Sequence, residues 1–470
     1  MRHKEAMNHR LIDRRLLKSA ALLCSAAFLV APGLSLARPV LMISIDGLRP
    51  GDVLEADKRG LKVPNLRRMV KEGVSATGVT GVLPTLTYPS HTTLITGVAP
   101  ATHGIVSNTT FDPRQINYGG WYWYAQDQKA RTLWDAAHDA GLTTANVHWP
   151  VSVAAKSLTW NLPQIWRSGH EDDAKLVKAL STEGLVDELE HDCAGPYAQG
   201  IDESADGDEN RARFAAALIA RHKPGFITVY LAGLDHQEHT TGPGSPEANA
   251  VLERLDALVG RLRDAELAAH PDAAIALVSD HGFAATDTEV NFFRAFIDAG
   301  LITLDTDGKV TGWDAMPWSS GGSVAIVLAR RDDAGLKDKV RAQVAKLAAD
   351  PQARIATVIE GPAIAAAGGN PQADFYLDLR PGAVASPFAG ASAPFVRPAR
   401  VKGMHGYFPG LADMRSTFLL TGKGIAGGGS LGEVDMRAIA PTLAQLMGAS
   451  LPDAQSRPLD LSKVAVKNMK

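Results

Sequence analysis

Three short apolar runs dominate the hydrophobic pattern of the chain, at Val40–Ile45, Phe226–Leu231 and Ala274–Val278. Runs of this length and composition are typical of strands that are buried on both faces of a parallel sheet. Between them, apolar residues recur with helical spacing and predict helices near residues 63–70, 132–138 and 210–221. This alternation of strands and helices predicts an α/β protein with a layered core and a mainly parallel sheet.

The pattern changes after Phe283, where predicted helices and strands follow one another less regularly. We expect residues 290–400 to form a small inserted α+β lobe that caps the core. The catalytic core would then consist of residues 38–289 and residues 401–470. A final helix is predicted over residues 436–447, before Gly448.

The first 37 residues differ from the rest. Residues 1–18 hold six basic side chains against two acidic ones, and a mostly apolar run over residues 19–30 follows. Small residues at Ser35 and Ala37 complete the pattern of a signal peptide cleaved after Ala37. Because the apolar run is shorter than the roughly 20 residues that span a bilayer, we expect no membrane anchor after cleavage. The sequence therefore predicts a periplasmic or secreted protein, and Arg14-Arg15 leaves twin-arginine export open.

Composition narrows the function classes. The 470 residues carry a net charge of −3, with 45% hydrophobic and 21% charged residues, which is typical of soluble globular proteins. Removing residues 1–37 leaves 42 basic and 49 acidic side chains, a net charge of −7. The chain has no excess of basic residues, so its composition does not favour a nucleic-acid-binding surface. Of two cysteines, Cys24 lies in the signal segment, so Cys193 has no disulfide partner in the mature chain.

Acidic residues and histidines follow the predicted core strands. In open α/β sheets the ligand crevice lies beyond the carboxyl ends of the strands, so these side chains are expected to meet there. They are Asp46 after the first strand, Asp235 and His239 after the second, Asp280 and His281 after the third, and His405 in a glycine-flanked loop. Three carboxylates and three imidazoles form a ligand set for two transition-metal ions, most simply zinc.

Hydroxyl groups are concentrated over residues 85–93, which run into the start of a helix predicted at residues 91–97. A hydroxyl at a helix N-terminus lies beside free backbone N–H groups and the positive end of the helix dipole, which suits a phosphoryl group. Helix capping by Thr87 or Ser90 is the alternative interpretation, and it is compatible with catalysis.

Six motifs in order resemble the alkaline phosphatase superfamily and, within it, the type I phosphodiesterase/nucleotide pyrophosphatase family. They lie at residues 45–47, 84–97, 103–108, 235–243, 279–282 and 403–407. The resemblance implies an alkaline-phosphatase-like fold and a metal-dependent hydrolase that cleaves phosphodiester or pyrophosphate bonds in small, nucleotide-like substrates. Three residues depart from the family's usual pattern: Ser90, His236 and Glu238.

The resemblance also implies individual roles. One zinc ion would be held by Asp46, Thr87, Asp280 and His281, and a second zinc ion by Asp235, His239 and His405. Thr87 would be the nucleophile, deprotonated by its metal, and would form a phospho-threonine intermediate. Asn108 would donate to a phosphate oxygen, helped by the backbone N–H of Tyr88, and the Tyr88 ring would lie against a nucleobase. His236 is a competing ligand, but the four-residue spacing from Asp235 favours His239.

Two alternatives remain open at the level of sequence. A phosphomonoesterase on the same core would need cationic groups for the extra phosphate charge. Residues 148–160 contain Lys156 but no Lys-x-Arg pair, which favours a diester or pyrophosphate substrate, whereas Lys156 and Arg167 keep the monoester open. The other alternative is a non-catalytic metal-binding protein, which the intact Thr87 and the six ligands disfavour. The sequence does not specify an oligomeric state.

Overall fold

The computed structural model describes residues 37–117, 120–165, 169–193, 195–388, 390, 392–462 and 464–466. The predicted signal segment lies outside these residues except for Ala37, and so does Arg167. Among the described residues, no helix combines the length and apolarity needed to cross a membrane.

A nine-stranded sheet forms the centre of the fold, in the order β19-β18-β2-β17-β6-β1-β5-β3-β4. Neighbours from β6 to β4 are parallel, β18 is parallel to β2, and β17 and β19 are antiparallel to their neighbours. The strands are β1 (Val40–Ile45), β2 (Val74–Thr80), β3 (Thr144–Val147), β4 (Trp160–Leu162), β5 (Phe226–Leu231), β6 (Ala274–Val278), β17 (Phe418–Thr421), β18 (Gly429–Asp435) and β19 (Ala465–Val466). The mainly parallel sheet of the sequence prediction is confirmed.

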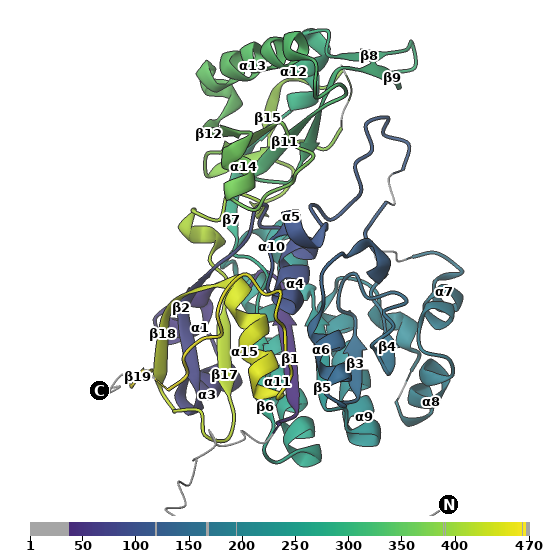
Figure 1. Ribbon diagram of the computed structural model, residues 1–470, viewed down its shortest axis with the longest axis vertical. Helices are drawn as coiled ribbons and strands as arrows, with labels where there is room; N and C mark the ends of the chain where they lie inside the picture. Colours follow the sequence, from purple (N-terminus) through teal and green to yellow (C-terminus); the bar gives the residue numbers. More distant parts are fainter. Residues whose placement is uncertain are drawn as a thin grey trace, which may run out of the picture. The chain divides into compact units, whose positions relative to one another are not determined.

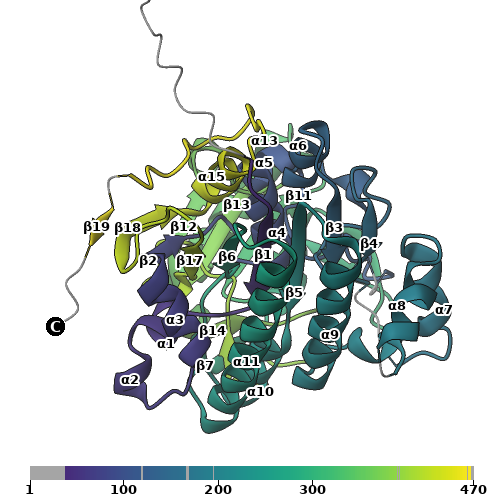
Figure 2. The same ribbon diagram turned by 90° about the horizontal axis from the view of Figure 1, so that it is seen from below.

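Alternate side chains of β1 enter two different hydrophobic layers, which explains why its sequence is a continuous apolar run. Leu41 and Ile43 pack with α3 (Pro64–Glu72), α9 (Ala205–His222) and α11 (Pro246–Ala269). Val40 and Met42 pack on the other face, with α4 (Thr87–Thr96), α6 (Leu133–Asp139) and α15 (Ile439–Leu446). Figures 1 and 2 show these two helical layers on opposite sides of the sheet. The predicted layered α/β core is therefore confirmed.

Residues 315–379 contribute a separate antiparallel sheet with the order β10-β11-β13-β12. Its strands are β10 (Ala315–Ser319), β11 (Ser323–Leu328), β12 (Ile355–Glu360) and β13 (Phe375–Leu379). Around it lie α12 (Phe292–Asp298), α13 (Ala334–Ala349), α14 (Pro362–Ala366) and the hairpin β8 (Ile302–Leu304) to β9 (Val310–Trp313) (Figure 1). The lobe boundaries expected at residues 290 and 400 stay a prediction.

A third sheet joins β7 (Ala284–Val290) to three strands from later in the chain. These are β14 (Gly382–Ala385), β15 (Val396–Pro398) and β16 (Gly403–Met404). The turn between β10 and β11 is also bonded to the loop after β16, because Gly322 N–H donates to the His405 carbonyl over 2.8 Å. The antiparallel sheet is thus tied directly to the loop that carries His405.

Two predicted helix boundaries differ from the structure. Helix α4 begins at Thr87 rather than residue 91, because Pro89 lies in the first turn, where a missing N–H costs nothing. The last helix begins as a 3₁₀ turn, Met436–Ala438, and continues as α15. The remaining helices are α1 (Pro50–Leu54), α2 (Ala56–Arg59), α5 (Pro100–His103), α7 (Asp173–Leu180), α8 (Leu185–Asp192) and α10 (Gly233–Thr241).

Candidate active site

The three central strands bring the predicted ligands to one edge of the sheet. Strand β1 lies between β5 and β6 and is parallel to both, with Ile45 paired with Leu231 and Ser44 with Val278. Asp46 directly follows β1, and Asp280 lies two residues beyond β6. Helix α10 begins two residues after β5 and carries Asp235 in its first turn. The carboxyl ends of parallel neighbours thus place three carboxylates together, as the sequence predicts.

The first group of donors consists of Asp46, Asp280 and His281. The His281 Nε2 atom lies 3.2 Å from Asp46 Oδ1 and 3.2 Å from Asp280 Oδ2. The Thr87 hydroxyl lies 3.4 Å from the same Nε2 atom, and only 7% of the Thr87 residue is exposed. The structure therefore brings all four residues proposed for one metal ion to a single buried point.

The second group consists of Asp235, His239 and His405. The Asp235 oxygens lie 3.3 Å from His239 Nε2 and 3.5 Å from His405 Nε2. The His405 ring stacks on His281 of the first group, with centroids 3.6 Å apart. The two groups therefore lie side by side, as a pair of metal ions acting on one phosphate requires.

All three histidines point Nε2 into the site and anchor Nδ1 on a backbone carbonyl. His239 pairs with Gly403 O over 2.9 Å, His405 with Thr85 O over 3.0 Å, and His281 with Gly282 O over 3.1 Å. A carbonyl accepts from a protonated Nδ1, which leaves the Nε2 lone pair free for a metal ion. The ring orientations thus match those of metal-binding histidines.

Carboxylate oxygens at the centre of the two groups have no hydrogen-bond donor. They are Asp46 Oδ1, Asp280 Oδ2 and Asp235 Oδ1. Burial, reinforced by neighbouring carboxylates, raises the pKa of Asp46 well above its usual value, and burial raises the pKa of Asp280 to about 8. Buried carboxylates without a donor are costly unless a cation lies between them, so the donor set fits divalent metal ions.

Removal of the metal ions by a chelator is expected to make the free energy of unfolding depend on pH. Without metal, the folded-state pKa is about 8 for Asp280, against 3.8 ordinarily, and about 9 for His239, against 6.5, because Asp235 offsets the burial of that ring. Between pH 7 and 9 the folded chain holds protons that the unfolded chain has released, so the free energy of unfolding falls as pH rises. Calorimetry should show Tm falling more steeply in this window for chelated than for zinc-loaded protein. Parallel pH profiles would contradict this expectation.

Thr87 is the first residue of α4, and its side chain does not cap the helix. The N-cap position is Leu86, which makes no side-chain hydrogen bond. Asn108 lies beside Thr87, and the Tyr88 N–H donates to Asn108 Oδ1 over 3.0 Å. This bond fixes the Asn108 amide next to Thr87 with its NH₂ group available as a donor. It also occupies the Tyr88 N–H, which the family resemblance assigns to a phosphate oxygen.

The Tyr88 ring is almost fully enclosed, with 1% of the residue exposed. It packs in a small cluster with Ile105 and Val151, and its ring centroid lies 5.4 Å from that of Trp121. Trp121 is only partly buried, so it is the outer ring of this aromatic pair. Stacking of a nucleobase directly on Tyr88 stays a prediction.

Two residues that the sequence does not single out connect the site to the core. His91 Nε2 pairs with Ser44 Oγ, and its Nδ1 pairs with the Thr87 carbonyl, both over 2.8 Å. Burial lowers the pKa of His91 to about 3, so this link is uncharged. Tyr230 donates its hydroxyl hydrogen to Asp46 Oδ2. The intervals from Ser44 to His91 and from Asp46 to Tyr230 are too long for any sequence spacing to reveal these contacts.

The two unusual residues of α10 have partners outside the two donor groups. His236 pairs with Glu203 over 2.8 Å and is half-exposed, whereas His239 meets Asp235. Glu238 is buried beside Arg49, at 3.4 Å. One helical turn separates Asp235 from His239, which explains why the four-residue spacing selects His239.

Comparison with known proteins agrees with this geometry. The family model of type I phosphodiesterase/nucleotide pyrophosphatase matches residues 40–407. The chain belongs to this family. Human ectonucleotide pyrophosphatase/phosphodiesterase family member 1 is 26% identical over 257 residues, covering 52% of this chain and 23% of that protein. An uncharacterized pyrophosphatase/phosphodiesterase of Schizosaccharomyces pombe is 26% identical over 261 residues, covering 53% of this chain and 45% of that protein.

Solved structures of the same family share the fold. Murine ectonucleotide pyrophosphatase/phosphodiesterase 5 superposes with a TM-score of 0.64 at 19% identity, covering 91% of this chain and 100% of that one. A second structure is an inactive threonine-to-alanine variant of the murine protein in complex with AMP, with a TM-score of 0.64 at 18% identity. It covers 91% of this chain and 100% of that one. The alkaline-phosphatase-like fold of the sequence prediction is therefore confirmed. The chain spans under half the length of the two curated relatives named above.

Proposed function

We propose that this family member is an exported, zinc-dependent hydrolase of phosphodiester or pyrophosphate bonds in nucleotide-like substrates. The observation that carries the proposal is the placement of the Thr87 hydroxyl, 3.4 Å from His281, beside two adjoining groups of metal donors. The AMP bound to the murine relative supports a nucleotide-like substrate. The same geometry disfavours a non-catalytic metal protein, because metal storage needs no buried hydroxyl beside the donors.

Thr87 is the nucleophile in the proposed mechanism. Zinc ions held by the two groups would supply Lewis-acid neutralisation of the attacking and leaving oxygens. Thr87 Oγ1 attacks phosphorus opposite the leaving oxygen, the bond to that oxygen breaks, and the phosphoryl group with its second substituent is transferred to Thr87. Water then hydrolyses the phospho-threonine, restores the hydroxyl and releases a phosphomonoester. The Asn108 amide holds a non-bridging oxygen throughout.

The surroundings of Lys156 support a diester over a monoester substrate. Lys156 lines a different cavity, with Trp134 and Asp135, and does not line the one that contains His239 and His405. No other lysine or arginine lines the site cavity in the described part of the chain. A monoester dianion carries more charge than a diester, and a site without cationic side chains stabilises it less.

Two model substrates test this proposal. At equal zinc concentration, we expect a higher kcat/KM for bis-(4-nitrophenyl) phosphate than for 4-nitrophenyl phosphate. The reverse order would contradict the diester assignment and favour a phosphomonoesterase. Hydrolysis of neither substrate by zinc-loaded protein would contradict the proposed reaction altogether.

Export follows from the predicted signal segment. We expect the protein recovered from a periplasmic or secreted fraction to begin at Arg38, which N-terminal sequencing measures directly. Recovery of a chain that still begins at Met1 from the same fraction would contradict cleavage after Ala37.

A further inference from the structure

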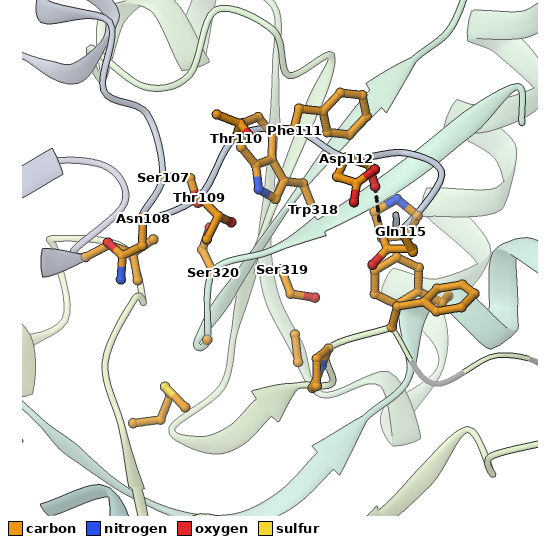
Figure 3. Close-up of a pocket in the computed structure, with 18 of the residues that line it drawn as sticks. Ser107, Asn108, Thr109, Thr110, Phe111, Asp112, Gln115, Trp318, Ser319 and Ser320 are labelled. Carbon is orange, nitrogen blue, oxygen red and sulfur yellow. Dashed lines mark hydrogen bonds between the residues drawn. The ribbon is translucent and has the colours of Figure 1, made fainter. Parts of the chain in front are cut away.

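A cavity of about 410 Å³ opens from the second donor group toward the antiparallel sheet. His239 and His405 form one end of it, and residues 107–112 form a wall. The end of β10, with Trp318 and Ser319, also lines it, and Trp318 lies next to Phe111. Figure 3 shows Thr109, Phe111 and Asp112 around this space, with the Trp318 ring next to Phe111 and with Ser319 and Ser320 nearby.

Aromatic side chains supply much of the lining. Phe111 and Trp318 lie with ring centroids 5.1 Å apart, and Phe293 and Phe388 form a second pair at 5.2 Å. These paired rings offer apolar surface to a bound group.

The lining of the cavity carries little charge. Among the described residues that line the cavity, none is lysine or arginine, and Asp112 is the one carboxylate. The Asp112 side chain is held in place, because its Oδ2 accepts the Asn117 N–H over 2.6 Å. A leaving pyrophosphate would enter this cavity with several negative charges and meet no cationic side chain, only a carboxylate.

The position of the cavity relative to Thr87 indicates which part of a substrate it receives. It is lined by both histidines of the second donor group and, at the phosphate, by Asn108, whereas Thr87, Asp46, Asp280 and His281 do not line it. Attack by Thr87 places the departing oxygen on the far side of phosphorus, away from the first group and next to the second. The cavity therefore lies where the leaving group departs.

We propose that this cavity is the leaving-group subsite and that it takes an uncharged group with an aromatic or alkyl body. The preferred substrates would then be phosphodiesters of such alcohols, and nucleoside triphosphates, which release pyrophosphate, would be poor substrates. This inference rests on the proposed function, since it assumes that Thr87 is the nucleophile.

Two thymidine substrates test the proposal, because they transfer the same thymidylyl group to Thr87. We expect the zinc-loaded enzyme to have a kcat/KM for thymidine 5′-monophosphate 4-nitrophenyl ester at least about tenfold above that for thymidine 5′-triphosphate. Thr110 is exposed and lines the cavity, so Thr110→Lys adds a cation there with little risk to folding. We expect this variant to lower the ratio of kcat/KM for the 4-nitrophenyl ester to kcat/KM for the triphosphate by about fivefold.

Ile116→Lys is the matched control. Ile116 belongs to the same loop, is 79% exposed and does not line the cavity, so the same added charge should leave the preference unchanged. A wild-type preference for the triphosphate, or an equal effect of both lysines, would overturn the leaving-group assignment while leaving the proposed function intact. If neither substrate is hydrolysed, the proposed function fails and this inference fails with it.

Discussion

Thr87→Ala is expected to lower kcat/KM for a phosphodiester by about 10⁴-fold or more, the scale seen when a catalytic nucleophile is removed. The reason is that no other hydroxyl replaces it. Thr85 donates to the Tyr407 carbonyl, and Ser90 is fully buried within α4. Zinc content should stay near two, because Asp46, Asp280 and His281 remain in place. Steady-state kinetics and metal analysis of the same preparation measure both quantities.

Thr96→Ala is a suitable control for this variant. Thr96 lies in the same helix, and its hydroxyl donates to the Thr92 carbonyl, away from the donor groups. Its loss removes that hydrogen bond and a longer one from the Val98 N–H, each worth about 1 kcal/mol or less, and should leave kcat/KM unchanged. A Thr87→Ala enzyme that retains more than a tenth of the wild-type rate, with normal metal content, would contradict the nucleophile assignment.

His239→Ala is expected to remove one of two bound zinc ions and to lower kcat/KM by more than about 100-fold. Mutating even a residue that only hydrogen-bonds to a metal ligand typically lowers metal affinity or activity by about 10- to 100-fold. His239 is the imidazole that meets Asp235, at 3.3 Å. Without it, Asp235 and His405 alone provide too few ligands for a tetrahedral zinc site.

His236→Ala is the matched variant for this test. His236 lies three residues earlier in α10 and pairs with Glu203 rather than with the donor groups. We expect zinc content and kcat/KM to stay close to those of the wild type, as measured by atomic absorption and steady-state assays. Loss of zinc in His236→Ala with retention in His239→Ala would show that the ligand assignment is reversed.

The donor residues could be located from sequence because of a property of parallel sheets. Asp46, Asp235 and Asp280 each follow an apolar run, and runs that pair in parallel must end at one edge. The four-residue spacing from Asp235 to His239 also follows from a helix turn. Local pattern therefore predicts the strands, the edge and most of the donor set.

The rest depends on contacts between distant parts of the chain. The hydrogen bonds of His91 with Ser44 and of Tyr230 with Asp46 form only in the folded sheet with its helices, and no local sequence pattern predicts them. Strand β17 joins the sheet antiparallel between β2 and β6, although it comes from residues 418–421. The cavity wall at Trp318 likewise comes from a segment more than 200 residues from Asn108. Periodicity describes single elements, and it carries no information on such pairings.

A crystal structure of the zinc-loaded enzyme with a nucleoside monophosphate, with anomalous data at the zinc edge, would show whether the two donor groups and Thr87 form a two-zinc site. We expect two anomalous peaks. One would be held by Asp46, Asp280, His281 and the Thr87 hydroxyl, and the other by Asp235, His239 and His405. A single peak, or a peak at His236 and Glu203 with the two donor groups empty, would contradict it.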